Sequence, residues 1–330
     1  MKLEIDNLSI RASTPAGHVG IVEDLSVILP EGATLGIVGE SGSGKSMLAL
    51  AIMGLLPQTM TASGCILLDG QNLLTLTEAE LCQIRGARIG MVFQEPMSAL
   101  NPAMRIGEQI AEGLVWHRGI SRAAAQAEAL RFLERVRIPD GVQRLKAYPH
   151  ELSGGQRQRV GIAIALAPGP RLLIADEPTT ALDVTVQAEI LDLLAELVSE
   201  LKMSLIIISH DMGVIAGMAD RTLVMYAGTR VEEGPTDAVL HRPIHPYTRG
   251  LLAAMPRRLE KDGTSEAIGR RGMRLASIPG SVPQPGRLPP GCRFADRCGE
   301  AIPACSTAEP AWRPLGIVRA VRCIRAENWL

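Results

Sequence analysis

Short apolar runs, separated by Gly and Pro, recur through the first part of the chain and predict buried strands. Leu3–Ile5 alternates apolar and acidic residues, Leu25–Leu29 is mostly apolar, and Thr34–Val38 is a nearly continuous apolar run. Such continuous runs are typical of strands covered on both faces. A Gly-rich segment follows, and then the apolar stretch Ser46–Leu55, which ends before Pro57 and predicts a helix. The expected order is strand, loop, helix.

The later part of the first 235 residues repeats this alternation. Leu172–Ala175 and Leu205–Ile208 predict two more buried strands, and Val186–Leu201 between them has the spacing of an amphipathic helix. Residues 103–147 are rich in Ala, Glu, Gln and Arg and carry apolar residues at helical spacing. Strands that alternate with helices predict an α/β fold with a largely parallel sheet. We expect residues 103–147 to form a helical subdomain.

Composition narrows the classes of protein that the chain can belong to. Its 330 residues suit one large domain plus a smaller extension, and 46% apolar with 21% charged residues is normal for a globular protein. A net charge of -1 gives no overall attraction to nucleic acid. Met1–Leu8 lacks the basic start and apolar run of a signal peptide, and no apolar run approaches the roughly 18 residues that span a bilayer. If the chain serves a membrane, another chain must cross it.

Residues 39–46 form a glycine-rich segment directly after the predicted strand Thr34–Val38. Glycines let backbone N–H groups converge on phosphate oxygens at the amino end of a helix. In such a loop the lysine reaches the β- and γ-phosphates, and the next hydroxyl ligates Mg2+. The alternative is a flexible turn, but the flanking strand and helix favour a phosphate site. The expected binding residues are Gly39, Glu40, Ser41, Gly42, Ser43, Gly44, Lys45 and Ser46.

Two acidic residues, Asp176 and Glu177, follow the predicted strand Leu172–Ala175. Ligands of open α/β sheets bind at the carboxyl ends of the strands. We expect Asp176 to hold Mg2+ through its coordination shell and Glu177 to act as the general base toward water. Acidic residues that end a strand are often only solvated loop residues, but the phosphate loop upstream favours the catalytic interpretation.

The segment Leu152-Ser153-Gly154-Gly155-Gln156 resembles the signature motif of the ATP-binding cassette (ABC) family. A hydroxyl and two glycines before a helix again suit an anion, and Ser153 can also cap that helix. The resemblance implies that this segment closes over the γ-phosphate of ATP held by a second cassette. Cap and anion site are compatible interpretations.

Three further residues resemble landmarks of this family and occur in its order. Gln94 resembles the glutamine that senses Mg2+ and the membrane partner, and His210 resembles the histidine that touches the γ-phosphate. Asp183 ends a segment, Ala181–Asp183, that resembles the one that crosses the dimer interface in this family. Each taken alone is more often an ordinary polar residue. Arg11-Ala12 departs from the family, because an aromatic residue usually stacks on adenine there, and the Arg11 guanidinium could stack in its place.

The resemblance to ABC cassettes covers residues 1–235 and implies a P-loop NTPase fold with three parts: a RecA-like core, an antiparallel β subdomain, and a helical subdomain at about 95–165. The segments 93–102, 176–191 and 245–248 resemble the ATPase subunits of dipeptide and oligopeptide importers. Residues 236–330 then form an extension of the kind found in that branch, with Pro279–Gly291 as an irregular loop. The resemblance implies an ATPase that powers peptide uptake, or uptake of nickel, opines, glutathione or another small solute.

The same resemblance implies the partners and the location. They are two transmembrane permease subunits, a second ABC ATPase that is either related or identical, and indirectly a solute-binding protein outside the membrane. The chain would lie on the cytoplasmic face of the inner membrane. A soluble cassette ATPase that acts on DNA or the ribosome is the rival class, but we find one cassette only and 3% aromatic residues, so no nucleic acid is expected.

The extension contains four of the six cysteines, with five, six and seventeen residues between successive members. Four thiolates can hold a 4Fe-4S cluster or Zn2+, and these gaps exceed those between paired cysteines of structural zinc sites. Similar extensions of the importer branch bind an iron–sulfur cluster, so the resemblance favours 4Fe-4S; Zn2+, free thiols and a primarily redox-sensing role remain alternatives. The residues are Cys292, Cys298, Cys305 and Cys323.

The other two cysteines and a group of arginines have simpler interpretations. Cys65 and Cys82 stand apart and are expected to be packing residues. Five basic residues before the irregular loop predict a solvated linker, with a membrane-facing patch as the alternative; they are Arg257, Arg258, Arg270, Arg271 and Arg274.

Overall fold

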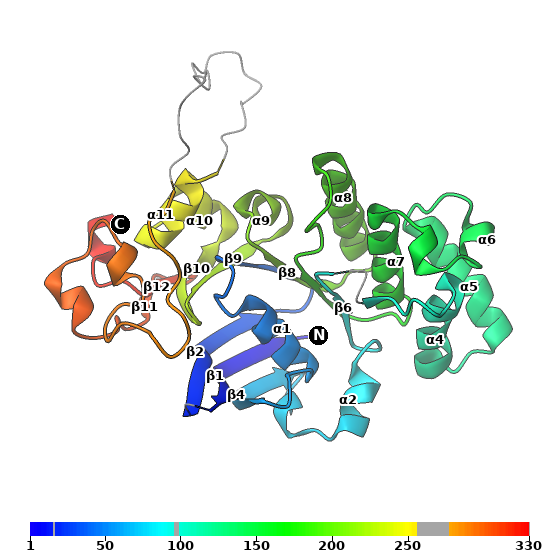
Figure 1. Ribbon diagram of the computed structural model, residues 1–330, viewed down its shortest axis with the longest axis horizontal. Helices are drawn as coiled ribbons and strands as arrows, with labels where there is room; N and C mark the ends of the chain where they lie inside the picture. The colour runs from blue at the N-terminus through cyan, green and yellow to red at the C-terminus, as the bar shows by residue number, and fades with distance from the viewer. Residues whose placement is uncertain (16, 96–98, 256–276, 330) are drawn as a thin grey trace, which may run out of the picture.

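A computed structural model describes residues 1–15, 17–95, 99–255 and 277–329, and it contains two sheets (Figure 1). The smaller, antiparallel sheet has the strand order β2-β1-β4-β5. Its strands are β1 (Leu3–Thr14), β2 (Gly17–Leu29), β4 (Met60–Leu68) and β5 (Gln71–Asn72). This sheet confirms the expected antiparallel β subdomain. Its two long strands extend beyond the predicted runs, because they pair with each other almost to their ends.

The larger sheet has eight strands in the order β11-β12-β10-β9-β3-β8-β7-β6. The five from β9 to β6 are parallel, and the other three are antiparallel to their neighbours. They are β3 (Thr34–Val38), β6 (Ile89–Val92), β7 (Leu172–Asp176), β8 (Ser204–Ser209), β9 (Arg221–Tyr226), β10 (Thr229–Pro235), β11 (Arg313–Leu315) and β12 (Arg319–Val321). The predicted parallel α/β core is confirmed.

Helices surround this sheet and form a separate group at one end of the molecule (Figure 1). The group contains α4 to α7 and includes the segment that the sequence predicts to be helical. The helices are α1 (Lys45–Met53), α2 (Glu78–Ile84), α4 (Ile106–Arg118), α5 (Arg122–Arg135), α6 (Gly141–Arg144), α7 (Gly154–Leu166), α8 (Val184–Glu200), α9 (Met212–Met218), α10 (Thr236–His241) and α11 (Pro246–Ala253). Short 3-10 turns are η1 (Leu73–Thr75), η2 (Pro149–Glu151), η3 (Ala295–Arg297), η4 (Pro303–Ser306) and η5 (Ala326–Trp329).

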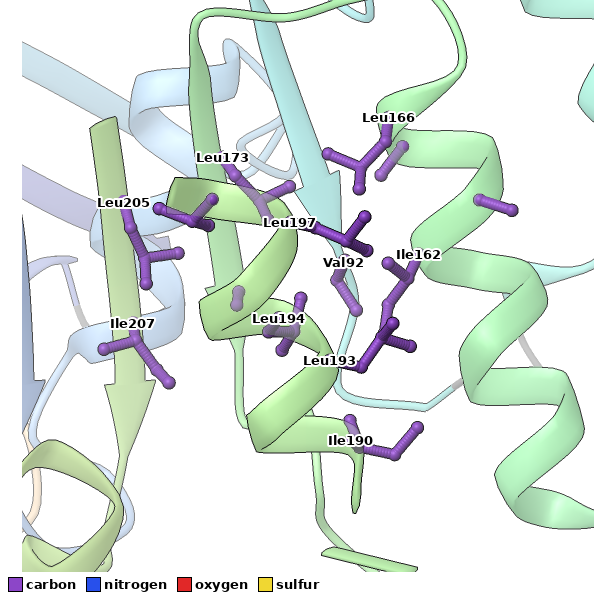
Figure 2. Close-up of a cluster of buried hydrophobic side chains, with 14 of the residues drawn as sticks. Val92, Ile162, Leu166, Leu173, Ile190, Leu193, Leu194, Leu197, Leu205 and Ile207 are labelled. Carbon is purple, nitrogen blue, oxygen red and sulfur yellow. The ribbon is translucent and has the colours of Figure 1, made fainter. Parts of the chain in front are cut away.

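The core that joins the helical group to the sheet is apolar (Figure 2). Leu193 and Leu197 of α8 are buried against Ile162 and Leu166 of α7, and Leu173 of β7 lies beside them. The apolar residues of α8 therefore recur at helical spacing because one face of the helix packs on β7 and β8. This packing holds α7 in a fixed relation to the carboxyl ends of the strands.

The extension is more regular than the sequence suggests. Pro279–Gly291 has no helix or strand, as predicted, but β11 and β12 lengthen the main sheet through the pairing of β12 with β10. A buried ion pair supports this join: Glu232 of β10 is fully buried, and Arg319 Nη2 donates to its Oε1 at 2.8 Å. The sequence does not reveal these strands, because three-residue strands carry no periodicity.

Two segments named in the sequence analysis lie partly or wholly outside the described residues. The basic residues between Arg257 and Arg274 lie outside the described part of the chain, as do residues 96–98 of the segment that follows Gln94. Among the described helices, none is both long and apolar enough to cross a membrane.

Candidate functional site

The glycine-rich segment joins the end of β3 to the start of α1. Gly44 is the N-cap of α1 and has a φ of 98°, a left-handed conformation that favours glycine. Gly39 is needed for a different reason, because a Cβ there would lie 2.2 Å from the carbonyl oxygen of Met225 on β9. The backbone therefore turns at the amino end of α1, where the first N–H groups of a helix lack partners within the helix and can bind an anion.

Lys45 is buried inside this loop, with 5% of its surface exposed. Its Nζ donates to the carbonyl oxygens of Gly39 at 2.7 Å and Glu40 at 3.0 Å. Burial lowers the pKa of Lys45, while the carboxylates of Glu177, Asp176 and Glu40 act in the opposite direction. Carbonyl groups of the loop thus hold the ammonium group of Lys45. Phosphate oxygens of a bound nucleotide can replace these carbonyl groups as its hydrogen-bond acceptors.

A hydrogen bond joins the side chains of Ser46, on α1, and Asp176. The Oγ of Ser46 donates to Oδ1 of Asp176 at 3.1 Å, and Asp176 ends β7 and is buried. Burial raises the pKa of Asp176, and the hydrogen bond from Ser46 opposes that rise. A hydroxyl beside a carboxylate next to a phosphate loop is a suitable donor set for Mg2+.

Three polar side chains contact the carboxylate of Glu177. Its Oε2 lies 3.2 Å from Nε2 of Gln94, 2.8 Å from Oγ1 of Thr180 and 3.2 Å from Nδ1 of His210. Glu177 itself has a φ of 45°, which turns the chain directly after β7. The structure therefore brings together Gln94, Glu177 and His210, which the sequence analysis singled out separately. Thr180 is a further member that the sequence analysis missed, and its only signal is its position three residues after Glu177.

The signature segment belongs to the helical group instead. Ser153 caps α7 by accepting from the backbone N of Gln156 at 3.3 Å, and the Gln156 side chain accepts from the Ser153 N at 3.1 Å. A Cβ on Gly154 would meet Leu182 at 3.5 Å, and one on Gly155 would meet Val186 at 2.7 Å. Within one chain, this segment lies against the start of α8, whereas α1 lies beside the antiparallel sheet (Figure 1).

Asp183 begins α8 and is exposed. Its carboxylate caps the helix by accepting from the backbone N of Val186 at 3.0 Å. The next side chain, Val184, is 74% exposed although it is apolar. Such exposure beside the signature segment suits a surface that contacts another chain.

Arg11 lies on β1 near the phosphate loop. It pairs with Gly20 of β2, and the neighbouring Ile21 places its carbonyl oxygen 3.1 Å from where a Cβ on Gly44 would lie. The Arg11 side chain is exposed. Its position agrees with a role beside the base of a nucleotide, which stays a prediction.

The four cysteines of the extension line one small cavity, together with His245 and Phe294. Burial raises the pKa of Cys292 to about 11 and also raises the pKa of Cys298 and Cys323. All the cysteines are free thiols. Within the described residues, however, no group of three or more His, Cys, Asp or Glu side chains is arranged to hold a metal ion. The cysteines are gathered, but their thiols do not form a metal site as they lie.

Comparison with known proteins identifies the family. A family profile described as ABC transporter matches residues 22–180, and one described as oligopeptide/dipeptide transporter, C-terminal region, matches residues 231–305. A peptide import ATP-binding protein of Brucella abortus is 50% identical over 97% of this chain and 94% of its own. The oligopeptide transport ATP-binding protein OppD of Salmonella typhimurium is 49% identical over 93% of this chain and 89% of its own.

Solved structures agree with this assignment. The ATP-binding cassette MJ0796, solved as a dimer in a post-hydrolysis state with ADP and phosphate, has a TM-score of 0.64 and 29% identity over 71% of this chain and 98% of its own. The cbiO1 protein of Clostridium perfringens, part of an ABC transporter complex, has a TM-score of 0.61 and 29% identity over 72% of this chain and 89% of its own. The chain belongs to the ABC transporter family as an ATP-hydrolysing subunit, in the branch with the oligopeptide/dipeptide transporter C-terminal region.

Proposed function

We propose that this ATPase powers the import of dipeptides and oligopeptides through separate membrane-spanning chains. The observation that carries the proposal is the convergence of Gln94, Thr180 and His210 on Glu177, beside Lys45 and its phosphate loop. Peptide cargo is supported by the relatives named above, a peptide import and an oligopeptide transport ATP-binding protein that match nearly the whole chain. Nickel, opines and glutathione are the alternative cargoes.

The residues divide into three roles. The loop N–H groups and Lys45 would hold the β- and γ-phosphates of ATP. Ser46, Asp176 and Gln94 would hold Mg2+, which when bound neutralises charge on the phosphates. Glu177 would accept a proton from the attacking water, because hydrogen bonds from Gln94 and Thr180 and the nearby His210 ring orient its carboxylate.

We further propose that each ATP lies between two cassettes. The signature residues Ser153–Gln156 belong to the helical group, so a second chain would supply them to the phosphate loop. The exposed Asp183 and Val184 support a contact surface at this place, and the related cassette MJ0796 is solved as a dimer. ATP can perform work in this arrangement because it favours the closed dimer over the open one. The partner is a second ABC ATPase, identical or related.

The remaining assignments follow from the same proposal. Residues 1–235 form the ATP-binding domain, with a helical subdomain at about 95–165, and residues 236–330 form the extension. Two transmembrane permease subunits would dock beside Gln94, where residues of β6 and α7 line an apolar pocket that includes Phe93 and Ile164. A solute-binding protein outside the membrane would deliver the cargo. The chain would lie on the cytoplasmic face of the inner membrane, with no nucleic acid as partner.

Uptake of labelled dipeptides and oligopeptides tests the proposal. Cells that lack the gene should lose uptake, and the wild type should restore it. Glu177→Gln should not restore it, although the purified variant should still bind ATP. Uptake that is unchanged in a strain without redundant peptide importers would exclude peptide cargo. Near-normal ATP turnover by Glu177→Gln would remove Glu177 as the general base.

We propose that the four cysteines of the extension hold a 4Fe-4S cluster, with Zn2+ as the alternative. Their gathering around one cavity supports the proposal, while the high pKa of Cys292 means that its thiol must lose a proton on binding. Metal content and visible absorption of protein purified without oxygen test it. Iron and a brown colour that disappear in Cys298→Ser support the cluster, zinc supports the alternative, and a metal-free wild type excludes both.

A further inference from the structure

The phosphate loop contains an acidic residue, Glu40, whose carboxylate forms an ion pair with Arg297 of the extension. Arg297, next to Cys298, donates from Nη1 to one carboxylate oxygen of Glu40 at 2.6 Å and from Nη2 to the other at 2.9 Å. The Arg297 side chain is only 5% exposed. This geometry is a paired, charge-assisted contact, which fixes both position and orientation. Its partners are 257 residues apart in the sequence.

Further hydrogen bonds hold Arg297 itself. Its Nε donates to the carbonyl oxygen of Pro279 at 2.8 Å, and its Nη1 also donates to the hydroxyl of Tyr226 at 3.2 Å. The guanidinium group therefore has little freedom, and Glu40 is held by a rigid donor. A lysine could supply the charge but not this fork of hydrogen bonds.

The extension side of the molecule also holds the backbone of Glu40. The Glu40 N–H donates to the hydroxyl of Tyr247 in α11 at 2.8 Å. Tyr247 is fully buried, and its ring packs on Tyr226 at 4.6 Å and on Phe294 at 5.3 Å between centroids. Arg297 thus holds the side chain of Glu40, and Tyr247 holds its main chain from a cluster of aromatic rings that includes Phe294.

A second arginine beside a cysteine supports the same loop indirectly. Arg293, next to Cys292, donates to the carbonyl oxygen of Ala227 at 2.6 Å and pairs with Glu23. The adjacent Gly228 donates its N–H to the carbonyl oxygen of Ser43 at 3.1 Å. The extension consequently reaches the phosphate loop by two independent routes.

The charge of Glu40 opposes the function of its loop. A carboxylate beside a site for several phosphate negative charges repels them, unless a cation compensates it. Lys45 cannot serve both purposes, because it is the cation expected to contact phosphate. Arg297, which belongs to the extension and not to the phosphate loop, forms an ion pair with Glu40 and so compensates this charge.

We propose that Arg297 is a positioning residue for ATP binding: it neutralises Glu40 and holds the phosphate loop in its binding conformation. The inference rests on the proposed function, because it requires ATP to bind this loop. By linkage, ATP and the folded extension stabilise each other to the same extent. The extension is therefore part of the nucleotide site and more than a neighbouring module.

A double-mutant cycle on the full-length protein tests this coupling. Dissociation constants for ATP are measured for the wild type, Arg297→Met, Glu40→Gln and the double variant, with KM and kcat measured in parallel. Arg297→Met should weaken ATP binding about tenfold or more, since it leaves a carboxylate uncompensated. Its kcat at saturating ATP should change much less, because the surroundings of Glu177 are unaltered. The double variant should regain most of the affinity, because the uncompensated charge is gone.

Two matched variants separate this effect from general damage to the extension. Arg319→Gln breaks another buried Arg–Glu pair of the extension, with Glu232 on β10. It should lower the unfolding temperature and change the ATP dissociation constant far less than Arg297→Met does. Arg297→Lys keeps the charge without the fork, so its affinity should be intermediate. Thiol and metal content are measured for every variant, because Cys298 follows Arg297 in the chain.

Several results would overturn the inference. They are wild-type affinity in Arg297→Met, an equal loss of affinity in Arg319→Gln, and additive effects in the double variant. If Arg297→Met does not fold, Arg297→Lys and its combination with Glu40→Gln provide the same comparison. A wild type that does not bind ATP would instead contradict the proposed function, so the two failures can be told apart.

Discussion

At the scale of single residues, Glu177 is where segments distant in sequence meet. Gln94 follows β6, Glu177 follows β7 and His210 follows β8, and the carboxyl ends of these parallel strands share one edge of the sheet. The hydrogen bond from Thr180 completes the group from within the turn after Glu177. A general base must be oriented toward the water that it deprotonates. Gln94, Thr180 and His210 all contact the carboxylate of Glu177, and together they fix its orientation.

Replacing Thr180 by Val tests whether that orientation matters. Valine has nearly the shape of threonine but cannot donate to Oε2 of Glu177, which now accepts at 2.8 Å. A hydrogen bond to a charged group contributes about 1.5 to 3 kcal/mol, so kcat should fall about tenfold or more. The ATP dissociation constant should stay within about twofold, because the hydrogen bond that is lost is to Glu177 and not to the phosphate loop. Steady-state ATPase rates and equilibrium binding check both values, and an unchanged kcat would show that Thr180 does not orient the base.

Residue patterns reveal some of this site but not all of it. The phosphate loop, Asp176 and Glu177 are visible because each follows a recognisable buried strand. Gln94 and His210 depend on resemblance, since one polar residue after a strand is unremarkable. Arg297 could not be found, because its partner is 257 positions away and nothing in the local sequence indicates that pairing.

At the scale of elements, the start of α11 depends on an uncharged histidine. His245 is 2% exposed, and its Nδ1 accepts from the backbone N of Tyr247 at 3.1 Å, which caps the helix. The backbone N–H of His245 donates to the buried carboxylate of Glu232 at 2.9 Å. Burial, together with the nearby charge of Arg249, lowers the pKa of His245 to about 3. Protonation would remove the acceptor that caps α11.

This shift predicts how stability depends on pH. The folded pKa of about 3 lies below the unfolded value of 6.5, so the unfolded chain binds the extra proton between these values. The contribution of His245 to stability is therefore complete above pH 6.5 and declines as the pH falls below it, by about 1.4 kcal/mol per pH unit. His245→Asn keeps a capping side chain without the titration. Thermal unfolding between pH 7.5 and 5 should show a smaller loss for His245→Asn than for the wild type, and parallel curves would contradict the assignment.

Elements also differ in how well their sequences predict them. Thr34–Val38 is found with its observed ends, because a strand buried on both faces leaves an uninterrupted apolar run. β1 and β2 are longer than their apolar runs; residues 11–14 of β1, for example, are not buried but pair with β2. β11 and β12 are each three residues long and depend on β10, which no local pattern can indicate.

At the scale of the whole molecule, the extension and the ATPase core form one structure. The expected boundary at residue 235 falls at the end of β10, yet β12 pairs with that strand from the other side. Aromatic rings cross the boundary too, because Phe294 packs edge-on against Tyr226 at 5.2 Å between centroids. A change in amino-acid composition marks where the extension begins, but it does not mark a mechanical boundary.

A chain that ends at Met255 should therefore be damaged in both stability and nucleotide binding. It would leave Glu232, which is fully buried, without Arg319, and Glu40 without Arg297. It would also uncover part of the buried ring of Tyr226, and uncovering one large apolar side chain costs about 1.5 to 3 kcal/mol. We expect loss of soluble protein, or an unfolding temperature lower by roughly 5 °C or more, with weakened ATP binding. Ile317→Ser, at a fully exposed position of the extension, is the control and should behave as the wild type. A truncated chain that folds and binds ATP normally would mean that the contacts of residues 277–329 with the ATPase core contribute nothing to the site.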